Sequence, residues 1–159
     1  MQKYVLVKFL EPMSEGEEFI ANNNWPLHIT LVANFAVPFD DQNLLMILTE
    51  QLKEQKAIPI IAGKDEFFGQ HKDIQVTTMK MTPELLSLHE ALVALLKSHG
   101  AEFDEPKYMN KGYRAHATIQ TGSRLNENDN VLLDEVTIVD MFPDNDITKR
   151  RVLQTVKLQ

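Results

Sequence analysis

Two short segments in opposite halves of the chain repeat one pattern: histidine, apolar residue, threonine, apolar residue. They are His28–Leu31 and His116–Ile119. Side chains alternate between the two faces of a β-strand, so each histidine shares a face with the threonine that follows it, and the apolar residues occupy the other face. The pattern therefore predicts two strands, each with a polar face toward a cleft and an apolar face toward a core.

Length and composition limit what kind of protein this is. With 159 residues, of which 43% are apolar, the chain suits a single two-lobed domain over residues 1–159. We find no apolar run long enough for a membrane span or a secretory signal, and we expect a soluble, cytoplasmic monomer with no membrane contact. The absence of cysteine excludes disulfides, thiolate nucleophiles and cysteine-ligated metals. The net charge of −7 disfavours a broad grip on duplex nucleic acid, so a nucleic-acid partner is expected to bind locally, at an end.

Hydrophobic patterning predicts strands interleaved with helices. Strands are predicted over residues 4–10, 27–32, 58–62, 66–68, 74–79, 114–121, 131–141 and 152–158. Helices are predicted from Ser14 to about Ile20, ended by Asn22–Asn24; from Asp40 or Asp41 to about Leu52; and from Thr82 to about His99, closed by Gly100. This order favours an α+β fold in which antiparallel sheets carry helices on the outside, with internal pseudo-symmetry between the two halves.

With both motifs placed on strands, the chain resembles the two-histidine phosphoesterase superfamily, and within it the 2′-5′ RNA ligase-like and RNA 2′,3′-cyclic phosphodiesterase branch. The resemblance covers most of the chain, because Phe67-Phe68-Gly69 and the long helix before the second motif also follow the family's order. It implies a bilobal fold with pseudo-twofold symmetry, in which each lobe mixes N- and C-terminal segments and contributes one motif to a central cleft. It also implies a metal-independent site without a cofactor. The short segment before Leu27 and the acidic composition depart from the family pattern.

Paired imidazoles beside hydroxyls suit the hydrolysis of a 2′,3′-cyclic phosphate. One of His28 and His116 would act as the base that activates water, and the other as the acid that protonates the leaving ribose oxygen. The pattern does not say which histidine has which role. Thr30 and Thr118 would donate hydrogen bonds to the non-bridging phosphate oxygens. The alternative is that both histidines are half-buried and satisfied by backbone partners, and that the threonines serve strand formation alone.

Four further residues are candidates for binding substrate. Arg114 lies two residues before His116, so it shares the polar face and could clamp phosphate, although an ion pair with a carboxylate is an equal alternative. Trp25 and Tyr113 each lie three residues before a motif histidine, and Tyr108 lies in the preceding loop. All three aromatic residues are candidates for stacking on a base, with packing in the core or at its rim as the alternative for Trp25 and Tyr113. His71, His89 and His99 receive no role.

Three functions remain open from the sequence. The leading hypothesis is a cyclic phosphodiesterase acting on an RNA end or a nucleotide, with 2′-5′ RNA ligation as a side activity. The second is a catalytically silent module that binds nucleotides or RNA ends in the same cleft. The third is an interaction protein that docks through the apolar stripe of the long helix, formed by Leu85, Leu88, Leu92, Leu95 and Leu96. A metal centre is disfavoured because the motifs supply neither His-x-His nor His-Glu-x-x-His spacing.

Overall fold

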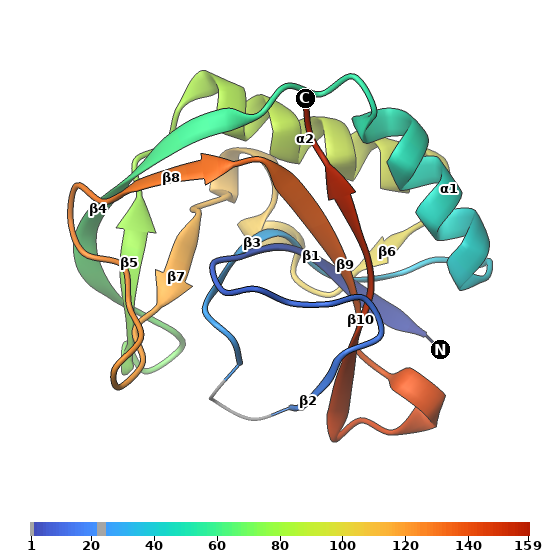
Figure 1. The fold of residues 1–159 in the computed structure, drawn as a ribbon, viewed down its shortest axis with the longest axis horizontal. Helices are drawn as coiled ribbons and strands as arrows, with labels where there is room; N and C mark the ends of the chain where they lie inside the picture. The colour runs from blue at the N-terminus through green and yellow to red at the C-terminus, as the bar shows by residue number, and fades with distance from the viewer. Residues whose placement is uncertain (1, 22–24) are drawn as a thin grey trace.

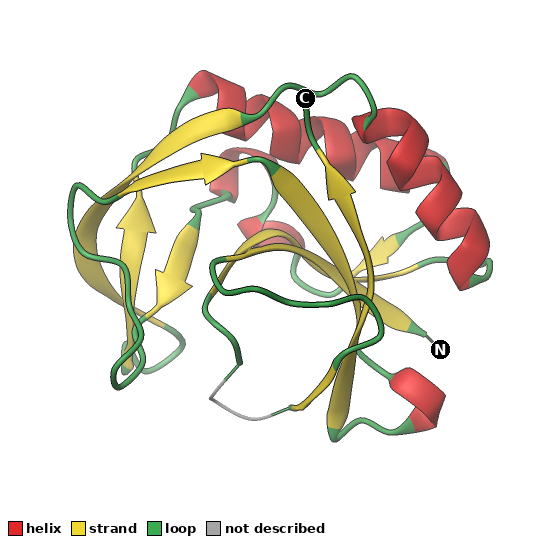
Figure 2. Ribbon diagram, viewed as in Figure 1, coloured by secondary structure: helices red, strands yellow, loops and turns green. Residues whose placement is uncertain are grey.

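A computed structural model describes residues 2–21 and 25–159 as two antiparallel sheets with two helices, which confirms the α+β prediction (Figure 2). The six-stranded sheet has the order β2 (Glu18–Ile20), β10 (Lys149–Lys157), β9 (Glu135–Asp140), β1 (Lys3–Phe9), β3 (His28–Ala36), β6 (Glu102–Phe103). The four-stranded sheet has the order β7 (His116–Thr118), β5 (Ile74–Met79), β4 (Ile58–Phe68), β8 (Asn130–Leu133).

Each sheet combines segments from distant parts of the chain. β1 lies between β3 and β9, so the six-stranded sheet mixes N- and C-terminal strands, as the resemblance implied. The run 131–141, predicted as one strand, is two strands: β8 belongs to the smaller sheet and β9 to the larger one, with Asp134 alone between them (Figure 1). Asp134 and Glu135 interrupt the apolar run where the chain passes from one sheet to the other, but a pair of acidic residues also occurs within single strands, so the pattern does not show the passage.

The two helices, α1 (Asp41–Leu52) and α2 (Pro83–Ser98), lie along the same outer side of the molecule (Figure 1). Both predicted caps are confirmed: the Asp40 carboxylate accepts from the amide of Asn43 at 3.0 Å, and the Thr82 hydroxyl accepts from that of Leu85 at 3.2 Å. The α2 stripe is core rather than surface, since Leu85, Leu88, Leu92 and Leu96 are all buried and Leu95 is half-buried. The hypothesis of a docking helix is therefore wrong.

The helix predicted from Ser14 is also wrong, because the segment forms a turn followed by β2. The amide of Ser14 donates to the Glu17 carboxylate at 3.1 Å, as a capping box requires. However, Gly16 adopts a left-handed φ of +85° and donates to the Val152 carbonyl at 2.8 Å. Pairing with the edge of β10 gives the segment backbone hydrogen bonds between strands. These bonds stabilise it more than a one-turn helix would. Asn22–Asn24, expected to end the helix, lie outside the described residues.

Several predicted strands have different bounds in the structure. The runs 58–62 and 66–68 form the single strand β4, whose register shifts between Ala62 and Asp65. The second motif strand shrinks to β7, because the chain turns soon after Ile119: the amide of Gln120 donates to the Ser123 carbonyl at 3.0 Å. β7 is consequently a short edge strand, held by β5 alone within the described sheet.

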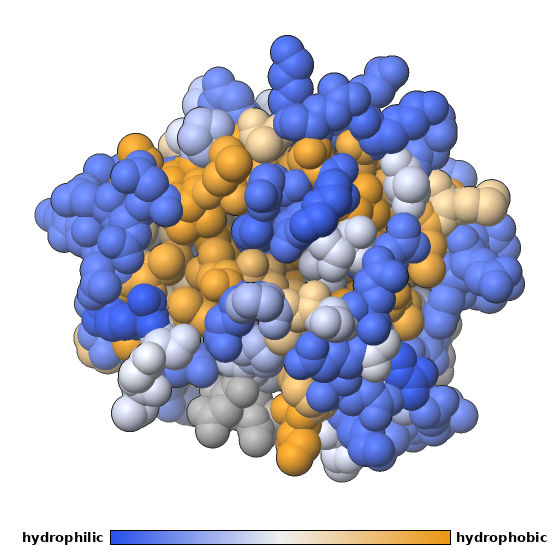
Figure 3. All heavy atoms as spheres, in the orientation of Figure 1, coloured by the Kyte–Doolittle hydropathy of each residue, from blue (hydrophilic) through white to orange (hydrophobic). Residues whose placement is uncertain are grey.

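Apolar side chains gather on the surface over β8 and the neighbouring part of β4 (Figure 3). Leu132 of β8 is 53% exposed and Ile61 of β4 is 40% exposed. In residues 2–21 and 25–159, neither helix is both long and apolar enough to cross a membrane.

Candidate active site

His28 and His116 are the first residues of β3 and β7, two strands that lie side by side although they belong to different sheets. The predicted alternation is confirmed in β3 and for His116–Thr118, but Ile119, predicted for the core face, lies beyond β7, is half-buried and lines the cleft. Ile29, Leu31 and Ala117 are buried, whereas both histidines, Thr30 and Thr118 are partly exposed. The apolar residues therefore anchor each strand in the core, and the polar residues are left on the opposite face.

Both imidazoles are held by the same local hydrogen bond. His28 Nδ1 lies 2.8 Å from the carbonyl oxygen of Pro26, and His116 Nδ1 lies 2.8 Å from that of Arg114, two residues earlier in each case. A carbonyl only accepts, so Nδ1 carries the proton in both rings. In the neutral form, Nε2 of each ring then keeps its lone pair and is the atom that can take a proton from substrate or water.

Aromatic side chains surround the two imidazoles. The His28 ring packs edge-on against Phe9 at 6.0 Å between centroids and lies 4.9 Å from Trp25. The His116 ring packs edge-on against Phe68 at 4.7 Å. Each imidazole is thus fixed by a backbone hydrogen bond and an aromatic neighbour, which restricts its rotation.

Burial lowers the pKa of both histidines below the usual value of 6.5. Each Nδ1 hydrogen bond opposes this effect. The pKa of His28 is lowered further by the neighbouring His116, and that of His116 by the Arg114 guanidinium. Both rings are therefore mainly neutral at pH 7.

A cleft of about 780 Å³ brings residues of both motifs together. His28, Thr30 and Thr118 line it, and Trp25 adds an aromatic wall. His116 is not part of this lining, but it lies two residues before Thr118 on the same face of β7, and its influence on the pKa of His28 places the two rings within electrostatic reach. The other polar lining residues are Asn34, Asp73, Gln75, Gln120 and Thr121, none of which the sequence singled out.

Arg114 forms an ion pair instead of standing free. Its guanidinium donates to both carboxylate oxygens of Glu66, at 2.6 and 3.1 Å, and lies over the Phe68 ring at 5.1 Å. This ion pair is the alternative that the sequence left open. Because Arg114 contacts the same Phe68 ring that packs on His116, the guanidinium is next to the second motif.

The three aromatic candidates lie in different environments. Trp25 lines the cleft, so it stays a candidate for stacking. Tyr113 is 8% exposed and its ring stacks on His89, with 3.9 Å between centroids and 3° between planes, so core packing is correct for it and base stacking is not. Tyr108 is 51% exposed, carries the Lys107 ammonium over its ring and is absent from the described cleft lining.

Sequence reasoning missed His89, which is 1% exposed and hydrogen-bonded through both ring nitrogens. A signal was present. His89 follows Leu85 by four residues and precedes Leu92 by three, which places it on the buried stripe of α2. A histidine on an apolar stripe must find internal partners, and the sequence does not reveal which ones.

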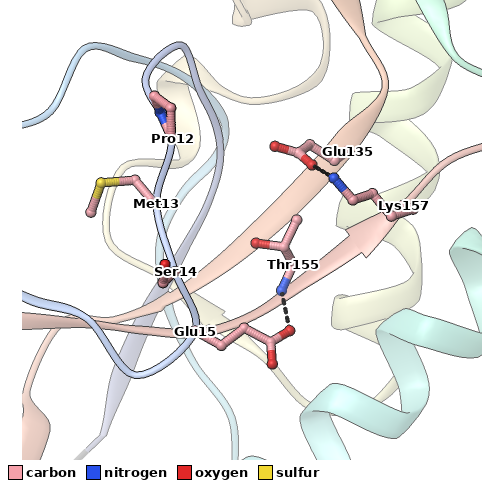
Figure 4. A pocket seen from close by; sticks show the side chains of 7 residues that line it. All are labelled: Pro12, Met13, Ser14, Glu15, Glu135, Thr155 and Lys157. Carbon is pink, nitrogen blue, oxygen red and sulfur yellow. Dashed lines mark hydrogen bonds and ion pairs between the residues drawn. The ribbon is translucent and has the colours of Figure 1, made fainter.

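A second pocket, of about 430 Å³, lies between residues 12–15 and strands β9 and β10 (Figure 4). Its charged groups are already paired: Lys157 contacts Glu135, and the Glu15 carboxylate accepts from the amide of Thr155 at 3.3 Å. The first contact joins β10 to β9, and the second holds the loop against β10. Among the described residues, no three histidine, aspartate or glutamate side chains come together as metal ligands.

Two antiparallel sheets, each with one strand that carries the His-x-Thr pattern, define the class: an α+β protein with one histidine motif on each sheet. The chain belongs to the 2′-5′ RNA ligase superfamily, whose family model matches residues 7–137. A comparison with curated proteins gives no match.

Solved structures share the fold at low sequence identity. E. coli LigT complexed with NADP⁺ is 14% identical with a TM-score of 0.60, and LigT complexed with 3′-AMP is 12% identical with a TM-score of 0.59. A crystal structure described as a phosphoesterase is 14% identical with a TM-score of 0.57. Each alignment covers 99% of this chain and 98% of the other. The chain therefore has a LigT-like fold over its whole length.

Proposed function

We propose that the protein is a metal-independent phosphoesterase that hydrolyses 2′,3′-cyclic phosphates on RNA ends or nucleotides. The observation that carries the proposal is the matched pair of imidazoles: His28 and His116 each donate from Nδ1 to the carbonyl two residues earlier, at 2.8 Å in both cases. This leaves two Nε2 atoms of the same tautomer, one from each sheet. Membership of a phosphoesterase superfamily supports the same reaction class.

In the proposed reaction, Nε2 of one histidine accepts a proton from water as the water oxygen attacks phosphorus. The other histidine, protonated on Nε2, donates its proton to the ribose oxygen as the phosphorus–oxygen bond to that oxygen breaks. Thr30 and Thr118 donate hydrogen bonds to the non-bridging oxygens, which gain charge in the transition state. One proton is taken from water and one is given to the ribose oxygen, which keeps the electron pair of the broken bond. The reaction therefore balances without a metal.

The substrate class follows from the cleft and from the family. Trp25 supplies an aromatic surface for a base, and Arg114 clamps phosphate after exchanging its Glu66 partner for the ligand. Structures of LigT with 3′-AMP, ATP and NADP⁺ support nucleotide-like ligands. If a 5′-hydroxyl of a second RNA replaces water as the nucleophile, the same site forms a 2′-5′ linkage, which we propose as the side activity.

The test is turnover of a nucleoside 2′,3′-cyclic monophosphate and of a short RNA with a cyclic phosphate end, with chelator present. His28→Asn and His116→Asn each keep a donor near the Nδ1 position and remove Nε2, so we expect each to reduce kcat at least about 100-fold with the fold intact. His71→Asn, at an exposed turn position, is the matched control and is expected to retain wild-type turnover. Arg114→Gln should raise KM more than it lowers kcat.

Turnover that survives in both motif variants would refute the mechanism. If wild type leaves both compounds unchanged while either compound raises its melting temperature, the silent binding module becomes the better description of the cleft.

A further inference from the structure

The strand that carries the first motif has an open side next to Thr30. Within the described chain, β6 pairs only with Phe35 and Ala36 of β3, so the half of β3 that begins at His28 has no strand on that edge. The register with β1 passes from Val7↔Thr30 to Leu6↔Val32, which makes Leu31 an extra residue, a β-bulge. A bulge rotates the backbone locally and frees carbonyl groups from the ladder.

Two side chains from outside the sheet bind these carbonyls. The Tyr113 hydroxyl donates to the Thr30 carbonyl at 2.9 Å, and His89 Nδ1 donates to the Leu31 carbonyl at 2.6 Å. Consecutive carbonyls of a regular strand point to opposite edges, so only the bulge allows both to be bound by one stacked pair of rings. The pair thus binds the backbone immediately after the Thr30 side chain.

The same pair also binds the segment that leads to the second motif. His89 Nε2 accepts from the amide of Asn110 at 2.9 Å, at the start of the 3₁₀ turn Asn110–Gly112. Tyr113 follows that turn directly and precedes His116 by three residues. Burial lowers the pKa of His89, which keeps the ring neutral, and only the neutral ring both donates from Nδ1 and accepts at Nε2.

We propose that His89 and Tyr113 are positioning residues that set the relative placement of the two motif strands. β3 and β7 belong to different sheets, so no ladder of backbone hydrogen bonds fixes one against the other. The stacked rings supply that link. His89, on α2, binds β3 and the turn before β7, and Tyr113 joins β3 to the chain that enters β7. Neither residue touches the reacting atoms, and the kinetic part of the proposal rests on the proposed function.

Three variants separate the parts of this link. Tyr113→Phe keeps the stacking and removes only the hydrogen bond to Thr30. His89→Phe keeps the stacking and removes both hydrogen bonds of the imidazole, whereas His89→Gln keeps a donor and an acceptor and loses the ring. Tyr108→Phe is the matched control, because this tyrosine is in the same loop and its ring is exposed. For each variant we would measure melting temperature, kcat, KM and the NMR titration of the His28 and His116 imidazoles.

We expect Tyr113→Phe to lower kcat roughly tenfold with KM within about twofold, because misplacement of catalytic groups acts on the transition state more than on binding. The His28 and His116 resonances should shift in Tyr113→Phe and stay unchanged in Tyr108→Phe. His89→Gln should retain more kcat than His89→Phe. If His89→Phe does not fold, Tyr113→Phe and His89→Gln decide the question.

Wild-type kcat together with unchanged imidazole resonances in folded Tyr113→Phe and His89→Gln would overturn the proposal. The NMR measurement needs no substrate. If wild type shows no turnover, the proposed function fails, and shifted or unshifted resonances in the variants still support or refute the positioning role.

Discussion

His28 and His116 are bound alike through Nδ1 but differ in the charges around them. Arg114 is next to His116, and its guanidinium lowers the pKa of that imidazole, whereas His28 is influenced by His116 itself. In both, burial is the largest cause and lowers the pKa. The two rings therefore compete for protons within the same acidic range, which suits a pair that must share one proton during turnover.

This arrangement predicts an acidic optimum for the free enzyme. The active form carries one proton on the pair, and its population is greatest between the two pKa values, both of which lie below 6.5. We expect kcat/KM to be maximal below pH 6.5 when it is measured between about pH 4 and 9 at constant ionic strength.

Arg114→Gln supplies an internal check on that profile. Removing the guanidinium removes a positive charge that lowers the pKa of His116, so one limb of the profile should move toward higher pH. A wild-type maximum above neutrality, or a profile that Arg114→Gln leaves in place, would contradict this account of the site.

Among the elements, the segment Pro106–Gly112 is closely packed on itself. Two short 3₁₀ turns follow one another in it, and a Cβ at Gly112 would collide with the carbonyl oxygen of Lys107. Asn110 at the start of the second turn adopts a left-handed φ of +55° and binds His89 through its amide. The second turn is therefore held both by the first turn and by His89, just before the chain enters β7.

The substitution Gly112→Ala tests how tightly the two turns are packed. The new methyl group forces the two turns apart, so we expect the free energy of unfolding to drop by about 1–3 kcal/mol, the usual cost of overpacking. Turnover should fall as well, because the displaced turn carries Tyr113 and the approach to His116. Thermal and urea unfolding give the stability, with Lys111→Ala, at the exposed neighbouring position, as the control. Equal stability of the two variants would show that the turns can open without cost.

Across the whole molecule, sequence reasoning recovered the parts that depend on local pattern. The two motif strands, the caps at Asp40 and Thr82, and the α+β class all follow from alternation, helical spacing and capping chemistry. It failed where distant segments decide the outcome. Pairing with β10 makes the Ser14 segment a turn followed by β2, and the passage between sheets at Asp134 divides the predicted strand 131–141 into β8 and β9.

The same distinction applies to the site. Alternation placed His28, Thr30, His116 and Thr118 on the exposed faces of their strands, but it carried no information on which partner each group finds. The pairing of Arg114 with Glu66 and the stacking of Tyr113 on His89 depend on tertiary contacts between segments far apart in the sequence. Local pattern does not encode such contacts.

The buried histidines also make the stability of the fold depend on pH. His28, His89 and His116 all have a lowered pKa in the folded state, for each of them mainly through burial. Well above pH 6.5 the three imidazoles are neutral in both the folded and the unfolded chain, so they do not change the free energy of unfolding. As the pH falls below 6.5, the unfolded chain binds protons that the folded chain does not, so the free energy of unfolding falls.

Urea unfolding at about pH 5 and about pH 8 measures this loss. His89→Gln removes one of the three groups and should reduce the difference between the two pH values, whatever it does to stability at pH 8. Asp140, whose pKa is raised by burial, works in the opposite direction and is present in both proteins, so the comparison cancels it. A difference that is equal in wild type and variant would exclude His89 as a source of the pH dependence.

The position of β1 in the middle of the larger sheet has a consequence for biosynthesis. β1 leaves the ribosome before the other strands described here, yet it pairs on one side with β9, and β9 in turn pairs with β10. The nascent chain therefore carries β1 and β3 with an unfilled edge until β9 has emerged, a state that exposes apolar strands to wrong partners. β9 completes the edge of β1, and β10 in turn covers β9, so the larger sheet is filled by strands that are synthesised long after the strand bearing His28.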